Sequence, residues 1–320
     1  METNPPITGS FLDGMPGDIP SQNWGAGEWR RQFDLFKEMG MDSLVIINGV
    51  TNEQAIYPTR VADVPLVYDD VPKGSADLAE FFFTLADERG LRIYMGLYDT
   101  YHHWYRNDWR SEVEACLPFI DEARARYGHH ASFHGWYMSH EGDERYNMPK
   151  IWRPLMERLR TLDPDKPILI SPRYAAEKYH GACVTGGAHP LTPAQHARYL
   201  DYMLSEVGGL VTAAAFMDGH CHFKDLKAFA EVTAETCARH HVEFWSNVET
   251  FDRDMPWRFP PIDWVKLRFK IETLRPFVSK MITFEAAHFL SPLSMFPSAR
   301  CLYDRYVEHY LGRAVPPRLS

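Results

Sequence analysis

Apolar positions along the chain follow two patterns that alternate from end to end. Eight short runs rich in β-branched and aromatic residues have the length of buried strands. They cover Ile7–Leu12, Ser43–Asn48, Leu91–Leu97, Phe133–Met138, Pro167–Ser171, Leu210–Met217, Val242–Val248 and Lys280–Phe284. Between and after these runs lie segments whose apolar residues recur at helical spacing, which predicts amphipathic helices. They cover Glu28–Met39, Ser75–Glu88, Trp109–Tyr127, Lys150–Leu162, Pro193–Val207, Lys224–Arg239, Asp263–Leu274 and Ser298–Leu311.

Polar and glycine residues lie where several of these helices should begin and end. Asp108 and Ser75 precede predicted helices and are typical N-caps. Gly40, Gly90 and Gly128 follow predicted C-termini, where glycine readily adopts the left-handed conformation. The end signals therefore agree with the periodicity.

Eight strand–helix units of about 40 residues each match an α/β fold, the (β/α)8 TIM barrel. A doubly wound sheet is the alternative, and it usually carries a glycine-rich turn after its first strand. Here the first run leads into Asp13-Gly14-Met15, and the chain contains no GxGxxG or Walker pattern. No repeat or linker divides the chain, so we expect one barrel domain over residues 1–320.

Charge and composition narrow the function classes. The 320 residues carry 34 Lys and Arg against 43 Asp and Glu, a net charge of −9, with no basic run. Binding to nucleic acid or to anionic lipid is therefore not expected. No apolar stretch reaches the roughly 18 residues that cross a bilayer, and the N-terminus lacks a signal-peptide pattern, so we expect a cytoplasmic protein or one whose leader has been removed. The five cysteines are far apart and without CxxC spacing, which argues against disulfides and a structural zinc site.

Polar and aromatic residues gather after the predicted strands. Reactive groups of a TIM barrel project from the carboxyl ends of its strands, so this bias predicts a chemical site at that rim. Carboxylates crowded into a partly dry pocket repel one another, which raises the pKa of at least one of them. The candidate substrate-binding residues are Asp13, Trp24, Tyr98, Asp99, His102, Trp136, Tyr137, His140, Arg173, Asp218, His220, Trp245, Glu285 and His288.

Two glutamates are the strongest catalytic candidates. Glu141 follows the fourth predicted strand and Glu249 the seventh, and these strands face each other across a barrel. Retaining glycoside hydrolysis needs one carboxylic acid to protonate the leaving oxygen and one carboxylate to attack the anomeric carbon. We expect Glu141 to be the acid/base and Glu249 the nucleophile.

Aromatic residues near the strand ends favour a carbohydrate substrate, because the apolar faces of sugar rings stack on aromatic rings. Trp104 and Trp257 are further candidates, whereas Trp29, Trp152 and Trp264 are expected to pack under the helices. The pattern leaves open whether Trp136 and Trp245 point into or out of the barrel. Arg173 is more easily explained as an ion-pair partner of Asp218 or Glu141 than as a clamp for an acidic sugar.

The chain also resembles a barrel family of unassigned function that is grouped with candidate glycoside hydrolases. The motifs that carry the resemblance lie in order along nearly the whole chain. They are Pro6-Ile7-Thr8-Gly9-Ser10-Phe11-Leu12-Asp13 with Trp24 and Glu28-Trp29, Lys37-Glu38-Met39-Gly40-Met41-Asp42, Gly135-Trp136-Tyr137 leading to Glu141, Phe216-Met217-Asp218-Gly219, Trp245 to Glu249, and Ile282-Thr283-Phe284-Glu285 with Ser291-Pro292. The resemblance implies a catalytic barrel that acts on sugars. More distantly, an acid after strand four and a nucleophile after strand seven look like the retaining clan of barrel glycosidases, whose acid/base commonly follows an Asn where this chain has His140.

Two alternatives stay open at this point. Glu141, Asp218, His220 and Glu285 could converge on Mn²⁺, Mg²⁺ or Zn²⁺, as in a metal-dependent sugar isomerase or epimerase of barrel fold. A non-catalytic carbohydrate-binding barrel would use the aromatic residues without the acids. The hydrolase reading requires no cofactor. The sequence does not indicate the sugar, the linkage or the oligomeric state.

Overall fold

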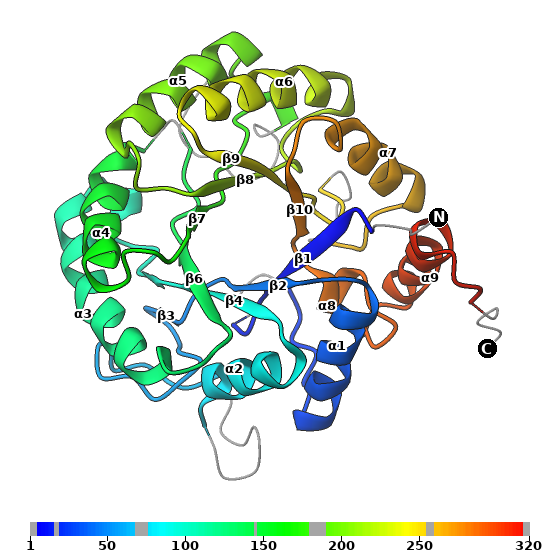
Figure 1. Ribbon diagram of the computed structural model, residues 1–320, viewed down its shortest axis with the longest axis horizontal. Helices are drawn as coiled ribbons and strands as arrows, with labels where there is room; N and C mark the ends of the chain where they lie inside the picture. The colour runs from blue at the N-terminus through cyan, green and yellow to red at the C-terminus, as the bar shows by residue number, and fades with distance from the viewer. Residues whose placement is uncertain are drawn as a thin grey trace.

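A computed structural model of the protein describes residues 5–15, 19–67, 76–143, 146–178, 190–253 and 259–315. All eight predicted strands form, and they pair in parallel in a closed barrel in the order β1-β10-β9-β8-β7-β6-β4-β2 (Figure 1). The strands are β1 (Ile7–Leu12), β2 (Ser43–Ile46), β4 (Arg92–Gly96), β6 (Phe133–Met138), β7 (Ile168–Ile170), β8 (Ala213–Met217), β9 (Glu243–Asn247) and β10 (Lys280–Thr283). The TIM-barrel prediction is confirmed.

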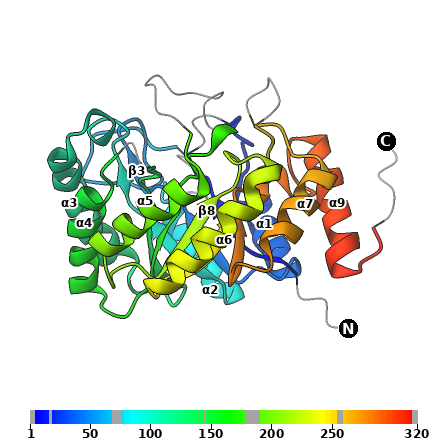
Figure 2. The same cartoon turned by 90° about the horizontal axis from the view of Figure 1, so that it is seen from above.

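Helices surround the barrel and run alongside its strands (Figures 1 and 2). They are α1 (Ala26–Glu38), α2 (Leu78–Arg89), α3 (Trp109–Tyr127), α4 (Pro149–Leu162), α5 (Pro193–Glu206), α6 (Phe223–Arg239), α7 (Trp264–Leu274) and α9 (Pro297–Leu311). The sequence pattern did not reveal four short elements in the connections, which are β3 (Val50–Thr51), β5 (Tyr98–Asp99), the 3-10 turn η1 (Trp104–Arg106) and α8 (Ala286–Phe289). Such elements are too short to show a period, and β3 and β5 form a two-stranded sheet separate from the barrel.

The predicted helix ends are largely as expected. The Asp108 side chain accepts a hydrogen bond from the Ser111 amide at the start of α3. Gly90 ends α2 in the left-handed conformation with φ +60°. Ser75 lies outside the described residues, and the N-cap of α2 is Asp77, which accepts from the Glu80 amide.

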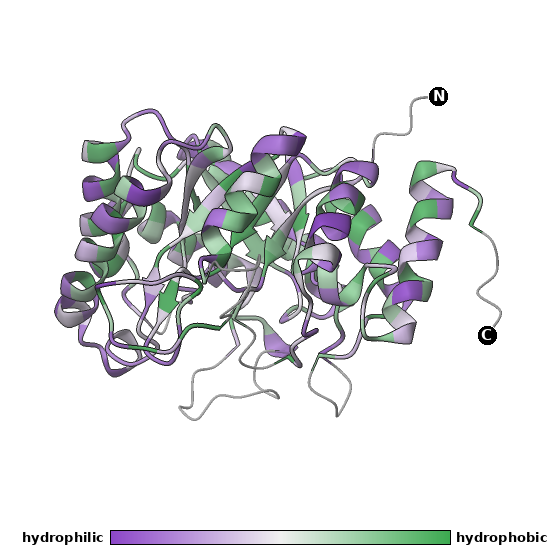
Figure 3. Cartoon of the chain, turned by 90° about the horizontal axis from the view of Figure 1, so that it is seen from below, coloured by the Kyte–Doolittle hydropathy of each residue, from purple (hydrophilic) through white to green (hydrophobic). Residues whose placement is uncertain are grey.

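Side chains alternate between two apolar layers. Inward-facing residues fill the barrel, among them Phe11, Tyr94, Tyr137, Trp245 and Ile282. The larger outer layer lies between strands and helices, where Trp29 and Trp152 are buried as predicted. Along the outer helices polar and apolar residues alternate, with apolar strands behind them (Figure 3). Since the inner and outer layers are both packed, only the ends of the barrel leave room for chemistry.

The amino ends of the strands are closed by charged side chains. Lys280 and Arg92 both pair with Asp42. The Trp245 indole N–H donates to Glu243 Oε2 at 2.8 Å, and the Lys280 ammonium lies 5.5 Å from the Trp245 ring centroid. This end of the barrel therefore has a stabilising role, which leaves the carboxyl ends as the mouth.

Among the described residues, no helix combines the length and the apolar character that a membrane crossing requires.

Candidate active site

The alternation of the strands brings both predicted glutamates to the mouth. Tyr137 on β6 and Trp245 on β9 point into the barrel. Glu141 and Glu249 each come four residues later along the same strand direction, so they continue the inward-facing series past the strand end. β7 and β8 separate β6 from β9 in the barrel. The two carboxyl groups therefore enter the mouth from well-separated strands.

Glu249 is 1% exposed and is held by charge and by hydrogen bonds. Arg253 binds both of its carboxylate oxygens, at 2.8 Å from Nε to Oε2 and 2.9 Å from Nη2 to Oε1. The Glu249 main-chain N–H donates to Asp218 Oδ1 at 3.1 Å, and Lys270 Nζ donates to the Glu249 carbonyl at 2.7 Å. A bidentate ion pair of this kind fixes the plane of the carboxylate.

Gly219, just after β8, leaves the space that the Glu249 carboxylate occupies. A Cβ atom at this position would lie 1.6 Å from Glu249 Oε2 and 2.7 Å from Arg253 Nε. Both distances are far inside van der Waals contact, so only glycine fits beside the ion pair. Gly219 is the last residue of the Phe216-Met217-Asp218-Gly219 motif, and this contact is a structural reason for a glycine there.

Asp218 is a buried acid of unusual electrostatics. Its Oδ1 lies 2.6 Å from Lys270 Nζ, and its Oδ2 has no hydrogen-bond partner among the described residues. Burial raises the pKa of Asp218 to about 6, with Lys270 opposing the shift and Glu249 adding to it. The predicted carboxylate crowding at the rim therefore exists, and its effect falls on Asp218.

Glu141 is half-buried and stands in a different environment. The Tyr137 hydroxyl lies 3.4 Å from Glu141 Oε1, and burial raises the pKa of Tyr137 well above its ordinary value, so the phenol stays a neutral donor. Arg173 donates to the Glu141 carbonyl and lies 3.7 Å from the Asp143 carboxylate. Arg173 is thus an anchor for this loop, in line with the ion-pair reading of the sequence, although its carboxylate partner is Asp143.

Two exposed tyrosines near Glu141 were missed as individual candidates. Tyr101 is 48% exposed and Tyr105 is 42% exposed, and their rings lie 6.4 Å apart with an angle of 17° between their planes. Tyr105 stacks on the buried Trp104 at 4.1 Å. Burial raises the pKa of Tyr105 to about 12, with smaller contributions from nearby carboxylates that include Glu141. The signal in the sequence was the density of aromatic residues over 98–105, and only the structure shows which rings stay open to solvent.

The Tyr101 hydroxyl is turned below the surface, where the Asn48 amide donates to it at 2.9 Å. Burial of this hydroxyl, together with Asp99 and Glu141, raises its pKa well above the ordinary value. Asp13 after β1 contributes in the same direction. Tyr101 therefore lies near side chains that follow three barrel strands, which are Asp13 after β1, Asn48 after β2 and Glu141 after β6.

Glu285 and His288 follow β10 and bind each other. Glu285 is the N-cap of α8, accepting from the amides of Ala287 at 3.1 Å and His288 at 2.7 Å, and it also pairs with the His288 imidazole. Burial lowers the pKa of His288, but Glu285 and, to a smaller extent, Asp13 raise it overall. Asp13 is therefore near both His288 and Tyr101.

Several predicted substrate-binding residues do not face the mouth. Trp136 points outward into the layer between strands and helices, and its indole N–H donates at 3.1 Å to Asp163, the C-cap of α4. Trp245 points inward but lies at the amino end of the barrel beside Glu243. These placements correct the prediction, because strand alternation sends Trp136 to the outer layer and the register of β9 puts Trp245 below the site.

Four more predicted substrate-binding residues are buried or bound to neighbouring side chains. Trp24 is 8% exposed and packs edge-on against Trp29 at 5.0 Å. Tyr98 is buried and donates to Asn52 at 2.6 Å. His102 is exposed, with Arg106 at 2.8 Å. His140 is fully buried, turned toward α3.

Asp99 is also buried, and it accepts hydrogen bonds from the Trp104 indole and the Tyr101 amide, each at 2.8 Å. Burial raises the pKa of Asp99 to about 6. It supports the loop of exposed tyrosines from below. His220 is buried just after Asp218 and Gly219, whereas Trp257 and Cys183 lie outside the described residues.

The proposed metal ligands are engaged elsewhere. Asp218 pairs with Lys270, and Glu285 pairs with His288 and caps α8. Within the described part of the chain, the clusters with metal-ligand composition are Glu80/His129/His130 and Glu112/Cys116/His140, and neither contains Glu141, Asp218, His220 or Glu285. In the buried second cluster, His140 Nε2 lies 2.9 Å from Glu112 Oε1, and Cys116 Sγ lies 2.8 Å from the Tyr98 carbonyl. These are hydrogen-bond contacts, and a thiolate ligand would repel that carbonyl.

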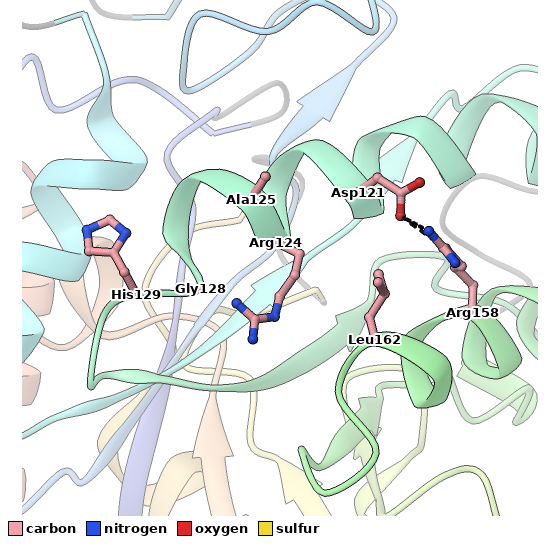
Figure 4. Close-up of a pocket in the computed structure, with 7 residues that line it drawn as sticks. All are labelled: Asp121, Arg124, Ala125, Gly128, His129, Arg158 and Leu162. Atoms are coloured by element: carbon pink, nitrogen blue, oxygen red, sulfur yellow. Dashed lines mark hydrogen bonds and ion pairs between the residues drawn. The ribbon is translucent and has the colours of Figure 1, made fainter.

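A surface cleft of about 560 Å³ lies between α3 and α4, away from the barrel mouth (Figure 4). Two lining residues, Asp121 and Arg158, form an ion pair at 2.6 Å (Figure 4). The cleft is lined by Asp121, Arg124, Ala125, Gly128, His129, Arg158 and Leu162. The cleft lies between two outer helices and not at the carboxyl ends of the strands, where the reactive groups of a TIM barrel project, so the mouth is the better candidate for catalysis.

Comparison with known proteins agrees with this reading of the fold. The family DUF4434, described as a domain of unknown function, matches residues 7–295. The chain belongs to the DUF4434 family. A solved structure from Bacteroides thetaiotaomicron, described as a "putative alpha-L-fucosidase", is 33% identical to this DUF4434 protein, covers 97% of this chain and 94% of its own, and superposes with a TM-score of 0.87. The resemblance to a barrel family grouped with candidate glycoside hydrolases is confirmed.

More distant structures share the barrel alone. The endo-1,4-beta-D-mannanase of Thermotoga petrophila is 12% identical, covers 94% of this chain and 99% of its own, and gives a TM-score of 0.57. A glycoside hydrolase family 5 mannosidase from Rhizomucor miehei is 11% identical, covers 96% and 94%, and gives 0.56. A search of curated proteins finds no match.

Proposed function

We propose that this DUF4434 protein is a retaining glycoside hydrolase, with Glu141 as general acid/base and Glu249 as nucleophile. The observation that carries the proposal is the unequal environment of two inward-facing glutamates at one barrel mouth. Glu249 is buried against a bidentate arginine, whereas Glu141 is half-buried beside the Tyr137 hydroxyl and the exposed tyrosines. Glu249 is thus buried in an ion pair, which suits a fixed nucleophile, whereas Glu141 lies at a more exposed position beside a phenol donor, which suits an acid/base.

The chemistry follows from these environments. In the first step protonated Glu141 gives its proton to the glycosidic oxygen while the bond from that oxygen to the anomeric carbon breaks. A Glu249 oxygen forms an ester with the anomeric carbon. In the second step the Glu141 carboxylate takes a proton from water, whose oxygen attacks the anomeric carbon and releases Glu249 as a carboxylate.

The Arg253 contact is compatible with nucleophilic attack. Each carboxylate oxygen has two lone-pair sites, and the bidentate pair uses one on each oxygen. Arg253 also lies over the rings of Phe251 at 4.8 Å and Phe259 at 5.3 Å, which hold the guanidinium in place. The Glu249 carboxylate is thus fixed in one orientation without losing every site for attack.

Stacking on Tyr101 and Tyr105 would hold the sugar. Their open faces beside Glu141 suit the apolar side of a pyranose ring. The relative described as a "putative alpha-L-fucosidase" makes α-L-fucosides the first substrates to test. Mannosides come next, on the basis of fold alone.

Trapping of the ester tests the proposal directly. The purified protein is screened on 4-nitrophenyl glycosides, then incubated with the 2,4-dinitrophenyl 2-deoxy-2-fluoro analogue of the sugar it cleaves. Intact-mass spectrometry should show one added glycosyl group on the wild type, peptide mapping should place it on Glu249, and NMR should show a product of unchanged anomeric configuration. Turnover by E249Q should fall by about 10⁴-fold or more.

The matched control is E243Q, because Glu243 lies on the same strand at the opposite end of the barrel. It should keep near-wild-type activity. Inverted product, a label on another residue, or full activity of E249Q would refute the retaining assignment. If E249Q instead keeps both sugar binding and the biological role of the wild type, the protein is a carbohydrate-binding barrel.

A further inference from the structure

A buried ion pair lies directly behind the proposed acid. His140 immediately precedes Glu141 and points away from the mouth, toward α3. Its Nε2 atom lies 2.9 Å from Glu112 Oε1, and both side chains have zero exposure. Because alternation turns His140 outward and Glu141 inward, a constraint on His140 is also a constraint on the direction of Glu141.

The same pair is tied to the loop of exposed tyrosines. Glu112 Oε1 accepts from the Thr100 amide at 3.1 Å, and Glu112 Oε2 accepts from the Thr100 hydroxyl. The Thr100 oxygen in turn accepts from the amides of His102 at 3.2 Å and His103 at 3.1 Å. A continuous series of hydrogen bonds therefore joins the residue before Glu141 to residues 100–106, which we call the aromatic loop.

The electrostatics favour a charged pair. Burial lowers the pKa of the His140 imidazole, but Glu112 and Asp99 raise it overall. Burial raises the pKa of Glu112, but His140 and Thr100 lower it overall. Cys116 Sγ lies 3.9 Å from both side chains, and burial keeps it a neutral thiol by raising its pKa.

We propose that His140 and Glu112 are positioning residues that hold the proposed acid, Glu141, in a fixed position relative to the aromatic loop. This inference rests on the proposed function for its catalytic meaning. The pair does not touch substrate. It links the proton donor to the tyrosines that would hold the sugar, so that both keep one relative geometry when the substrate binds.

The catalytic test uses leaving groups of different basicity. H140Q keeps a side-chain N–H donor but loses the positive charge, and the double variant H140Q/E112Q replaces the ion pair with two amides. A misplaced acid should lower kcat/KM for a substrate with a poor leaving group. It should hardly change kcat/KM for a substrate that releases 2,4-dinitrophenolate, which departs without protonation. We expect H140Q to lower kcat/KM by about 10²-fold or more on an alkyl glycoside and by less than about 3-fold on the 2,4-dinitrophenyl glycoside. H140Q/E112Q should recover part of the alkyl glycoside activity.

H196Q is the matched control. His196 is a second buried histidine, bound at 3.0 Å to Thr233, and burial lowers its pKa to about 3, so it is neutral. The effect of H196Q on kcat/KM should not depend on the leaving group. An equal loss on both substrates in H140Q would mean a structural role only and would overturn the proposal.

A second readout does not depend on catalysis. The Trp104 indole N–H donates to Asp99 and reports on the order of the aromatic loop. NMR of ¹⁵N-tryptophan-labelled protein should show exchange of this proton at least about 10-fold faster in H140Q than in the wild type or H196Q. If the wild type cleaves no glycoside, the proposed function fails, and unchanged exchange in H140Q would separately refute the link between the pair and the loop.

Discussion

Replacing Lys270 with Met should destabilise the protein in a way that depends on pH. Lys270 is 3% exposed, and its ammonium lies 2.6 Å from Asp218 Oδ1 and 2.7 Å from the Glu249 carbonyl. Met fills a similar volume but carries no charge. The substitution therefore leaves Asp218 as a fully buried carboxylate without its cation.

The magnitude follows from linkage. Removing one partner of a buried ion pair costs about 3–5 kcal/mol, which we expect for K270M at pH 8. In the wild type the pKa of Asp218 is about 6, so the folded protein has lost this proton by pH 8. Without Lys270, which lowers that pKa, folded Asp218 should keep its proton well above pH 6, while in the unfolded chain it is ionised. The destabilisation should then grow by up to about 1.4 kcal/mol per pH unit between pH 6 and 8.

Urea unfolding followed by circular dichroism at pH 6, 7 and 8, at constant ionic strength, measures this difference. The double variant D218N/K270M should lose the pH dependence, because no titrating carboxyl remains beside the Met. K227M is the matched control, since Lys227 is 69% exposed and pairs with Glu231 on the same helix. It should change the free energy of unfolding by less than about 0.5 kcal/mol. A K270M cost that is below about 1 kcal/mol, or that is the same at pH 6 and 8, would refute the reasoning.

Three further predictions concern the mouth. G219A should lower kcat by about 10²-fold or more while the melting temperature changes little, because the new methyl group would displace the Glu249 carboxylate; G27A, whose Cβ meets nothing within 4 Å, should leave activity unchanged. R253M should lower kcat/KM more than R253K does, because Lys keeps the charge but cannot bind both oxygens of Glu249; equal losses would contradict a role for the bidentate geometry. Y105A should raise KM by about 10-fold with a smaller change in kcat, measured on an aryl glycoside, and an unchanged KM would remove Tyr105 from the sugar site.

Much of the fold could be predicted because its signals are local. Eight apolar runs and eight amphipathic segments are long enough to show their period, and the caps at Asp108 and Gly90 mark helix ends through short-range hydrogen bonding. The short elements β3, β5, η1 and α8 show no period and were not predicted. In a parallel barrel the strand ends must gather at one rim, so the position of Glu141 and Glu249 at the mouth also followed from their order in the chain.

The partners of these residues depended on tertiary structure. Lys270 on α7 pairs with Asp218 after β8, and His140 after β6 turns to Glu112 on α3; no local pattern relates the members of these pairs. The sequence by itself determined the barrel and the end at which its polar residues collect, because periodicity and chain direction are encoded residue by residue. Only the tertiary structure decided which carboxyl group is bound by an arginine, that burial raises the pKa of Asp218 and which aromatic ring stays open, because burial and ion pairing depend on neighbours brought together by folding.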